Sequence, residues 1–299
     1  MEDYKKILVA LDLDEDDSSV IKFASSVSKL AGSEEVHFYH VADELDIPEK
    51  LCSEILEGSG TCDTIMAHME DVVKADWEGS DSTKLSYEAS DGDVLKDLLA
   101  YIKNKDIDLV MVQKTCGGSK IPERLARKAP CSVIMVPPGA EPTFKKIFVA
   151  VDFSDFSMKA LERAISYATA AGADTVNCIH VYAVPTGYHK TGRTLEQFSE
   201  ILKNNAIENF EKITGKMDLK GIKTDFIIEM NERPFQGIAD LVSKNGGDLL
   251  VVGSRGRSKT SAILLGSVTE RLIEVCNVPI HAYKRKGQGL SFIEAMFDI

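Results

Sequence analysis

The sequence lacks any long uninterrupted apolar run, which restricts the class of protein it can encode. No stretch of its 299 residues approaches the ~18–20 apolar residues that a membrane-spanning helix requires. The N-terminal residues, MEDYKKILVALDLDEDD, are acidic and already strand-like, which differs from the pattern of a signal peptide. We therefore expect a soluble cytoplasmic protein without a membrane partner.

Positive charge is also scarce. The chain has 35 Lys and Arg against 47 Asp and Glu, so its formal net charge is −12 and its pI is about 5.1. This balance disfavours nonspecific binding to nucleic acid or to an anionic membrane surface. It leaves room for a local basic pocket that holds a small anionic ligand.

Cysteine pairs with metal-binding spacing are absent. None of the six cysteines forms a CxxC motif, and a structural zinc site needs tighter spacing than this chain offers. We expect reduced thiols that are mostly buried. Cys52 and Cys62 lie in a polar segment and would pair only under oxidising conditions.

The chain contains an internal repeat. The segment KKILVALDLDEDD and its continuation from Lys5 align with KKIFVAVDFSDFS and its continuation from Lys145, without a gap over 37 residues. Further on, DIDLVMVQ at 106–113 matches GGDLLVVG at 246–253. Such a repeat indicates two copies of one fold joined by the Pro/Gly-rich segment PPGAEPT. We expect domains at 1–138 and 144–286, then an apolar tail at 287–299 that docks within the chain.

Strand-like and helix-like segments alternate in each copy. In the second copy a β-branched run at 146–152 precedes a helical pattern at 154–172, with Ser154 or Asp155 as N-cap and Gly172 as the stop. This alternation predicts an α/β fold of two tandem Rossmann-like domains, each a parallel five-stranded sheet with helices on both faces. Residues 43–82 of the first copy are expected to be helical.

A glycine-containing loop, GSRGRSKTSAILLGS at 253–267, follows the apolar run DLLVV. Gly253 is expected to let the chain leave the strand in a conformation that other residues avoid. Backbone amides near Gly256, the start of a helix at Ser267, and the cations of this loop favour an anion. We predict a phosphate cradle here, with a plain turn as the alternative. GxxxxGK[ST] and GxGxxG are absent, which argues against Walker-type and dinucleotide-binding loops.

The segment VVGSRGRSKTSAILLGSVTERL resembles the G-x2-G-x9-G-[ST] signature of the universal stress protein family. The tandem repeats, VAVDFS and the closing VCNVPIHAY are similar to that family as well. The resemblance implies adenine nucleotide α-hydrolase-like domains, packed as a pseudo-dimer within one chain; a homodimer of chains stays open. It also implies ATP as the ligand, with ADP, AMP and an accompanying Mg²⁺ left open.

The resemblance implies a nucleotide-binding set in the second copy. At the base and ribose end the set comprises Ala150, Asp152, Val181, Val252 and Gly253. Around the phosphates it comprises Arg255, Gly256, Gly266, Ser267 and Val268. Asp152 would meet the ribose or adenine, although a carboxylate at a helix start is the plain alternative. We expect His180 to be a packed strand-end histidine, and we expect no metal-ligating or catalytic residue.

The first copy departs from the signature. Its equivalent loop reads VMVQKTCGGSKIPERLARK, so Gln113 replaces the first glycine and the loop is shorter. Asp12 persists, but the acidic run Asp14–Asp17 would repel phosphate. We predict that the first copy binds no nucleotide and acts as a structural partner, with a smaller anion site at GGSK left open.

Three functions remain open. The first is a nucleotide-dependent stress-response sensor or regulator that binds an unidentified protein partner. The second is a slow ATP hydrolase, and a module acting only through protein contacts is a third. The SGGxDS, HIGH and KMSKS motifs, which mark enzymes of similar fold that split ATP between its α and β phosphates, are absent. No nucleophile and general base have the spacing of a catalytic pair. This pattern favours a binding protein and leaves enzymatic activity open.

Overall fold

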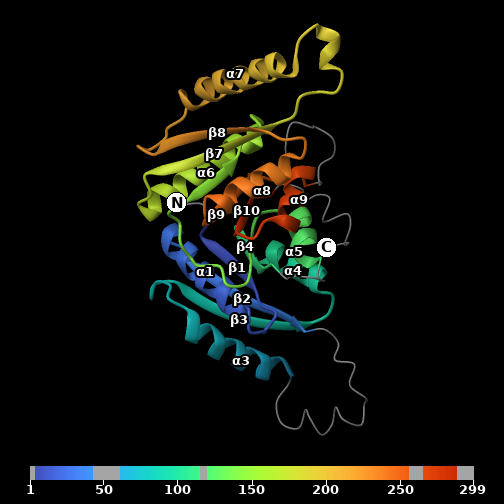
Figure 1. The fold of residues 1–299 in the computed structure, drawn as a ribbon. Helices are drawn as coiled ribbons and strands as arrows, with labels where there is room; N and C mark the ends of the chain where they lie inside the picture. Colours follow the sequence, from blue (N-terminus) through green and yellow to red (C-terminus); the bar gives the residue numbers. More distant parts are fainter. Residues whose placement is uncertain (1–3, 43–60, 115–119, 256–264, 288–299) are drawn as a thin grey trace. The chain divides into compact units, whose positions relative to one another are not determined.

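The computed structural model describes residues 4–42, 61–114, 120–255 and 265–287. The contacts between residues divide the chain into two units. Figure 1 colours the chain from blue at its N-terminus to red at its C-terminus. Unit 1 comprises Met1–Pro142 together with Lys284–Ile299, and unit 2 comprises Thr143–Tyr283. The return of the chain to unit 1 has a clear cause, because the Lys284 Nζ donates hydrogen bonds to the carbonyl oxygens of Arg127 and Ala129, each at 2.9 Å.

Unit 1 is built on a parallel sheet with the strand order β3-β2-β1-β4-β5. Its strands are β1 (Lys6–Ala10), β2 (Glu35–Ala42), β3 (Lys84–Asp91), β4 (Leu109–Gln113) and β5 (Ser132–Val136). Its helices are α1 (Asp17–Ala31), α3 (Thr61–Asp76), α4 (Val94–Asn104) and α5 (Ile121–Lys128). The expected helix within 43–82 is therefore present as α3, and the part at 43–60 lies outside the described residues.

Unit 2 repeats this arrangement with the strand order β8-β7-β6-β9-β10, again entirely parallel. Its strands are β6 (Ile147–Ala150), β7 (Thr175–Tyr182), β8 (Lys223–Met230), β9 (Leu249–Gly253) and β10 (Ile280–Tyr283). Its helices are α6 (Asp155–Ala171), the short 3-10 helix η1 (Tyr188–Thr191), α7 (Leu195–Thr214), α8 (Pro234–Lys244) and α9 (Ser267–Val275). The predicted Rossmann-like α/β fold is confirmed.

The central strands are buried on both faces. Ile7, Leu8 and Val9 of β1 have no exposed surface, and neither do Ile147 and Val149 of β6. Right-handed crossovers place helices on the two faces of each sheet, as Figure 1 shows for α1 and α4 and for α6 and α8. Continuous apolar strands are the sequence pattern that such two-sided burial requires.

Helices α1 and α6 end alike but begin differently. Gly32 and Gly172 follow them in the left-handed region, with φ of 61° and 70°. At the start of α6 the Ser157 hydroxyl accepts a hydrogen bond from the Asp152 amide at 3.3 Å. In α1 the equivalent residue is Asp17, whose carboxylate accepts from the amides of Asp12 at 3.2 Å and of Leu13 at 2.7 Å. The buried carboxyl group of Asp17 thus accepts the loop amides in unit 1, as the Ser157 hydroxyl accepts a loop amide in unit 2.

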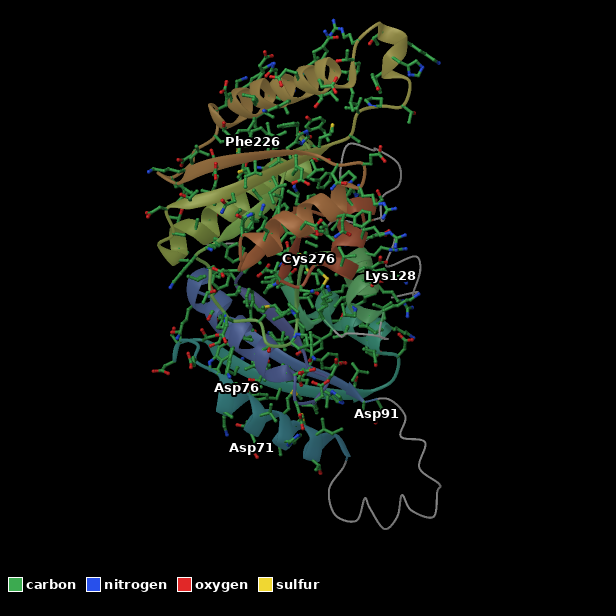
Figure 2. The ribbon with its side chains drawn as sticks, in the orientation of Figure 1. Asp71, Asp76, Asp91, Lys128, Phe226 and Cys276 are labelled. Atoms are coloured by element: carbon green, nitrogen blue, oxygen red, sulfur yellow. The ribbon has the colours of Figure 1, made fainter. Side chains whose placement is uncertain are left out.

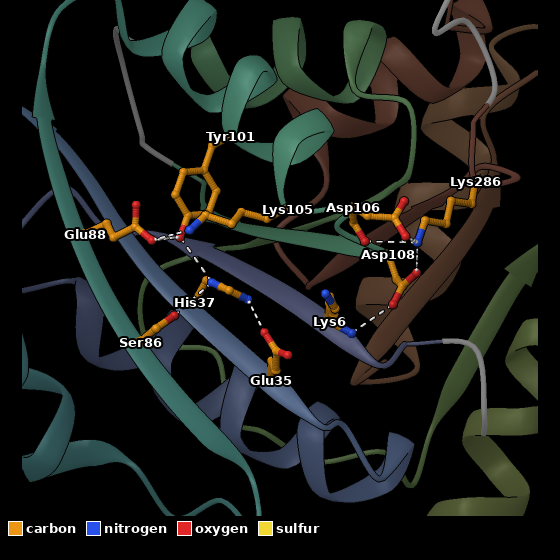
Figure 3. Close-up of polar contacts among 10 residues, drawn as sticks. All are labelled: Lys6, Glu35, His37, Ser86, Glu88, Tyr101, Lys105, Asp106, Asp108 and Lys286. Atoms are coloured by element: carbon orange, nitrogen blue, oxygen red, sulfur yellow. Dashed lines mark hydrogen bonds and ion pairs between the residues drawn. The ribbon is translucent and has the colours of Figure 1, made fainter.

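A polar cluster joins β2, β3 and α4 of unit 1 (Figure 3). The His37 Nδ1 lies 3.1 Å from the Tyr101 hydroxyl and 2.8 Å from the Ser86 hydroxyl, and its Nε2 lies 3.1 Å from Glu35. The Tyr101 hydroxyl donates to Glu88 at 2.9 Å. Burial lowers the pKa of His37, so the neutral ring fits this cluster. Its Nε2–H donates to Glu35, and its Nδ1 accepts from the Ser86 hydroxyl.

Helix α7 is attached to the edge of unit 2 by aromatic stacking. The rings of Phe210 and Phe226 are parallel within 1° with their centroids 3.9 Å apart, and Phe226 lies between β8 and α7 in Figure 2. A capping box between Thr194 and Gln197 fixes the first turn of this helix. Neither α7 nor any other helix in the described parts of the chain has the length and apolar character to cross a membrane.

The cysteines that the structure describes are buried free thiols, as expected. They are Cys131, Cys178 and Cys276. Burial raises the pKa of the Cys131 thiol to about 12 and also raises that of Cys178, so neither is a nucleophile at neutral pH. The side chains of the other three cysteines, Cys52, Cys62 and Cys116, lie outside the described part of the chain.

Asp17 is expected to make unit 1 less stable as the pH rises. Burial raises its pKa to about 7, the amides of Asp12 and Leu13 oppose this shift, and the Asp14 and Asp12 carboxylates add to it. Because the folded state binds the proton more tightly, its contribution is full below the ordinary pKa near 4 and is lost as the pH rises through about 7. Asp17→Ser, which installs the residue of unit 2, should remove this slope.

Denaturant unfolding of both proteins at pH 4, 5, 6, 7 and 8 measures the effect. The difference in unfolding free energy between the variant and the parent protein should move steadily in favour of the variant from pH 4 to pH 7. A difference that is the same at every pH would show that Asp17 titrates normally in the folded protein.

Candidate functional site

A cavity of about 490 Å³ opens at the carboxyl ends of β6, β7 and β9 in unit 2. In this parallel sheet the connections leave β6 and β9 in opposite directions, and ligands of such folds bind at that point. Nine of the ten residues of the predicted nucleotide-binding set line the cavity: Ala150, Asp152, Val181, Val252, Gly253, Arg255, Gly266, Ser267 and Val268. The tenth, Gly256, lies outside the described residues.

Asp152 stands at the mouth of the cavity and is half-buried. Its Oδ1 accepts hydrogen bonds from the Ser154 hydroxyl at 2.6 Å and from the Ser154 amide at 3.0 Å. Ser154 in turn caps α6, so the carboxylate supports the helix start as well as bordering the cavity. The ligand role and the structural role of Asp152 are therefore compatible in one side chain.

The main chain of Val181 faces the space beyond the end of β6. The ladder between β6 and β7 ends at the pair Ala150 and Ile179, and the Ile179 carbonyl accepts the Val151 amide at 2.8 Å. Alternate residues of a central strand bond to opposite neighbours, so Val181 turns its amide and carbonyl to the same side as Ile179. Within the described residues, β6 has already ended there, and these polar groups border the cavity.

The opposite end of the cavity is formed by the start of α9. Gly266 is the N-cap residue, its amide donates to the Ser254 carbonyl at 2.8 Å, and α9 begins at Ser267 as expected. The amides of a first helical turn lack partners within the helix, and the helix dipole adds partial positive charge there. Arg255 brings a full positive charge, and its guanidinium lies 5.7 Å from the centre of the Phe156 ring. This end of the cavity suits an anion.

Gly253 is needed for a reason other than the one expected from the sequence. Its φ does not lie in the left-handed region, so conformational freedom does not explain the glycine. A Cβ on Gly253 would instead lie 2.9 Å from the main-chain carbon of Phe156, closer than real Cβ atoms approach. The glycine permits close contact between β9 and the start of α6, and this contact shapes one wall of the cavity.

An apolar and aromatic wall was missed by the sequence reasoning. It consists of Phe153, Tyr182, Leu202, Pro234 and Ile238. Phe153 directly follows Asp152 and Tyr182 directly follows Val181, so the neighbours of predicted residues were a usable signal. Leu202 and Ile238 come from α7 and α8, and no local pattern indicates that these helices line the cavity.

Phe153 is held in an uncommon conformation. Its φ is 64°, in the left-handed region, and its ring centroid lies 4.7 Å from that of His180. The His180 Nδ1 donates to the Val151 carbonyl at 2.7 Å, and the side chain is buried, as expected for a packed strand-end histidine. His180 therefore supports the Phe153 ring. The described residues contain no group of three or more His, Cys, Asp or Glu side chains suited to a metal ion.

Unit 1 has a cavity at the equivalent position, with a volume of about 1200 Å³. The described residues that line it include three carboxylates, Asp12, Asp14 and Asp93, and no Lys or Arg. Gln113 stands where unit 2 has Gly253, and seven residues (114–120) separate β4 from α5, whereas thirteen (254–266) separate β9 from α9. The same part of the fold thus carries an acidic cavity in unit 1 and an anion-compatible one in unit 2.

The sequence of this chain is similar to those of known proteins. The sequence profile of the universal stress protein family matches residues 143–284. Universal stress protein MJ0577 of Methanocaldococcus jannaschii is 30% identical over 158 residues, which cover 48% of this chain and 96% of that protein. Universal stress protein MJ0531 of the same organism is 34% identical over 148 residues, which cover 48% of this chain and 85% of that protein. Each of these relatives therefore matches about half of the present chain.

Two solved structures extend the similarity of fold to nearly the whole chain. A functionally unknown protein from Pseudomonas aeruginosa superposes with a TM-score of 0.68 at 18% identity, covering 99% of this chain and 97% of that one. A universal stress protein from Archaeoglobus fulgidus superposes with a TM-score of 0.62 at 18% identity, covering 95% and 97%. With the strand order, the nine gathered residues and the sequence relatives in agreement, the chain belongs to the universal stress protein family.

Proposed function

We propose that unit 2 binds an adenine nucleotide, ATP in the first instance, and that the protein is a nucleotide-dependent regulator in the cytoplasmic stress response. The observation that carries the proposal is the cavity at the ends of β6, β7 and β9, which has an apolar, hydrogen-bonding end and a cationic end. Its volume of about 490 Å³ lies in the range typical of small-molecule sites. The signature of the 253–267 loop supports the same ligand.

The base would occupy the apolar end. Phe153 and Ile238 provide surfaces for a flat ring, and the unpaired strand edge at Val181 offers one amide and one carbonyl. Adenine presents a ring nitrogen acceptor beside an amino donor, which matches such an edge. Asp152 would accept from a ribose hydroxyl, as a carboxylate at this position can.

The phosphates would occupy the end formed by α9. The amides of Ser267 and Val268 lie in the first turn of that helix, and Arg255 adds the charge that a polyphosphate requires. An accompanying Mg²⁺ would be coordinated mainly by the phosphates and water, as this ion prefers. The fit therefore does not depend on a preformed protein metal site.

Unit 1 would bind no nucleotide. No arginine is among the described residues that line its cavity, its loop is shorter than that of unit 2, and Asp12 and Asp14 would oppose phosphate. In this proposal the ligand is held rather than consumed, and its presence changes what unit 2 offers to a protein partner. Isothermal titration with ATP and Mg²⁺ tests the binding, and one site per chain is expected.

A hydrolase would be distinguished by turnover. Mass spectrometry of the small molecule released from heat-denatured protein should find intact adenine nucleotide if the protein only holds it. Phosphate release over many turnovers, falling together with ATP binding in Arg255→Ala, would instead show an enzyme. Flat titrations with ATP, ADP and AMP would remove the basis of the proposal.

Arg255→Ala should weaken ATP binding selectively. A hydrogen bond to a charged partner contributes about 1.5–3 kcal/mol, so the affinity for ATP should fall by about 10- to 100-fold. Adenosine, which lacks phosphates, should bind as before. Arg271→Ala is the matched control, because Arg271 lies on α9, pairs with Glu274 at 2.7 Å and does not line the cavity. Equal losses in the two variants would point to general charge rather than to a phosphate contact.

Phe153→Leu should weaken ATP and adenosine binding alike. The substitution removes an aromatic surface from the base end and leaves the α9 end unchanged, so a loss of several-fold is expected for both ligands. Phe144→Leu serves as the control, because Phe144 is a buried aromatic residue of unit 2 that does not line the cavity. If Phe153→Leu affected ATP alone, the base would not occupy the end assigned to it.

A further inference from the structure

The cavity of unit 1 is rich in hydrogen-bond acceptors and negative charge. We propose that it binds an aliphatic organic cation of the polyamine class, through carboxylates at two of its edges, the Gln113 carboxamide and the strand edge at Val41. This site is separate from the nucleotide site proposed for unit 2 and does not require that site to be occupied.

The carboxylates come from two different elements. Asp12 and Asp14 belong to the loop between β1 and α1, and Asp93 is the N-cap residue of α4, where its Oδ1 accepts the Lys96 amide at 2.8 Å. All three side chains lie at the exposed rim of the cavity, which contains no Lys or Arg among its described lining residues. Negative charges at separate edges of one cavity favour a ligand with several ammonium groups on a flexible chain.

Gln113 is an independent sign of a ligand. The side chain lines the cavity from the end of β4, it is 4% exposed, and its Oε1 is buried without a hydrogen-bond partner in the structure. A buried polar atom without a partner is costly, because the group has lost water and gained nothing. Unit 2 avoids this cost with Gly253 at the same position. The carboxamide borders the cavity, and a turn about its terminal torsion would bring Oε1 to an N–H donor of a ligand there.

The strand edge that faces the proposed adenine in unit 2 also exists in unit 1. The ladder between β1 and β2 ends at the pair Ala10 and Tyr39, with the Tyr39 carbonyl accepting the Leu11 amide at 3.0 Å. Val41 is two residues further along β2, so its carbonyl turns into the cavity and adds another acceptor. An ammonium or secondary amine can donate to all of these groups.

An aromatic surface completes the site. The Tyr39 ring lines the cavity and is fixed by a stacked contact with Tyr101 at 4.4 Å and by a 2.7 Å hydrogen bond between its hydroxyl and Ser90. Tyr39 is only 6% exposed, so it borders the site as a fixed contact of small area. Among the described lining residues an anionic ligand would find no Lys or Arg, and a compact metal ion would leave most of a cavity of about 1200 Å³ unused.

Titration of the 299-residue chain with spermidine, in the absence of nucleotide, tests the proposal. One molecule should bind per chain, and hydrogen exchange should slow in the β1–α1 loop and at the start of α4. Asp12→Asn combined with Asp14→Asn should lower the affinity by tenfold or more. Circular dichroism and the Tm of the free variant verify that it is folded.

The control variant carries Glu141→Gln and Glu208→Gln, which remove the same charge from exposed positions outside the cavity. It should bind spermidine as the parent protein does. Equal losses in the two double variants, or no binding by the parent protein, would overturn the proposal by leaving only nonspecific attraction to an acidic surface. Mg²⁺ that binds with the same dependence on Asp12 and Asp14 while spermidine does not would overturn it in favour of a metal site.

Gln113→Met separates a ligand contact from a structural role. The substitution keeps the length of the side chain and removes the unsatisfied buried acceptor. The affinity for spermidine should therefore fall several-fold while the Tm of the ligand-free protein stays equal or rises. A lower Tm with unchanged spermidine affinity would show that Gln113 serves the fold, and the proposal would lose its central contact.

Discussion

The point at which β6 stops determines what unit 2 can hold. β6 ends at Ala150, opposite Ile179, whereas β7 continues to Tyr182. The extra length of β7 leaves main-chain groups of Val181 with no strand of the described residues on the β6 side, and the divergence of the connections from β6 and β9 leaves space above them. The start of α9 closes that space from the other side. The apolar and charged residues that line the cavity depend on this main-chain geometry for their positions.

The same geometry recurs in unit 1 with the same register. β1 ends at Ala10 opposite Tyr39, and β2 continues to Ala42, so the two cavities share their main-chain frame. Their chemistry differs through a few side chains. Gln113 replaces Gly253, and Asp14 replaces Ser154. A repeat within one chain can thus keep one fold and place different charged side chains at the two cavities, where unit 2 has Asp152 and Arg255 and unit 1 has three carboxylates among the described lining residues.

The cost of this difference is visible in the buried polar groups. Asp17 lies where unit 2 has Ser157, and its burial raises its pKa to about 7. The buried Gln113 Oε1 has no partner in the structure. Gln113 lines the acidic cavity, and Asp17 accepts from the amide of Asp12, which also lines it, whereas Ile7, Leu8 and Val9 in the middle of the sheet are wholly buried. Polar groups that strain a fold commonly collect beside a site, since function rather than packing retains them.

Much of this protein could be predicted from the sequence. The repeat, the alternation of strands and helices, the caps at Ser154 and Gly172, and the helix start at Ser267 all follow from local patterns, because backbone geometry and capping depend on neighbouring residues. The nine described members of the predicted set did gather around one cavity, since parallel strands bring their carboxyl ends to a single edge. Tertiary structure alone decided that Leu202 and Ile238 complete the wall, that Gly253 serves close packing against Phe156, and that Gln113 is buried without a partner. Those features depend on how distant segments meet, and no spacing along the chain encodes that distance.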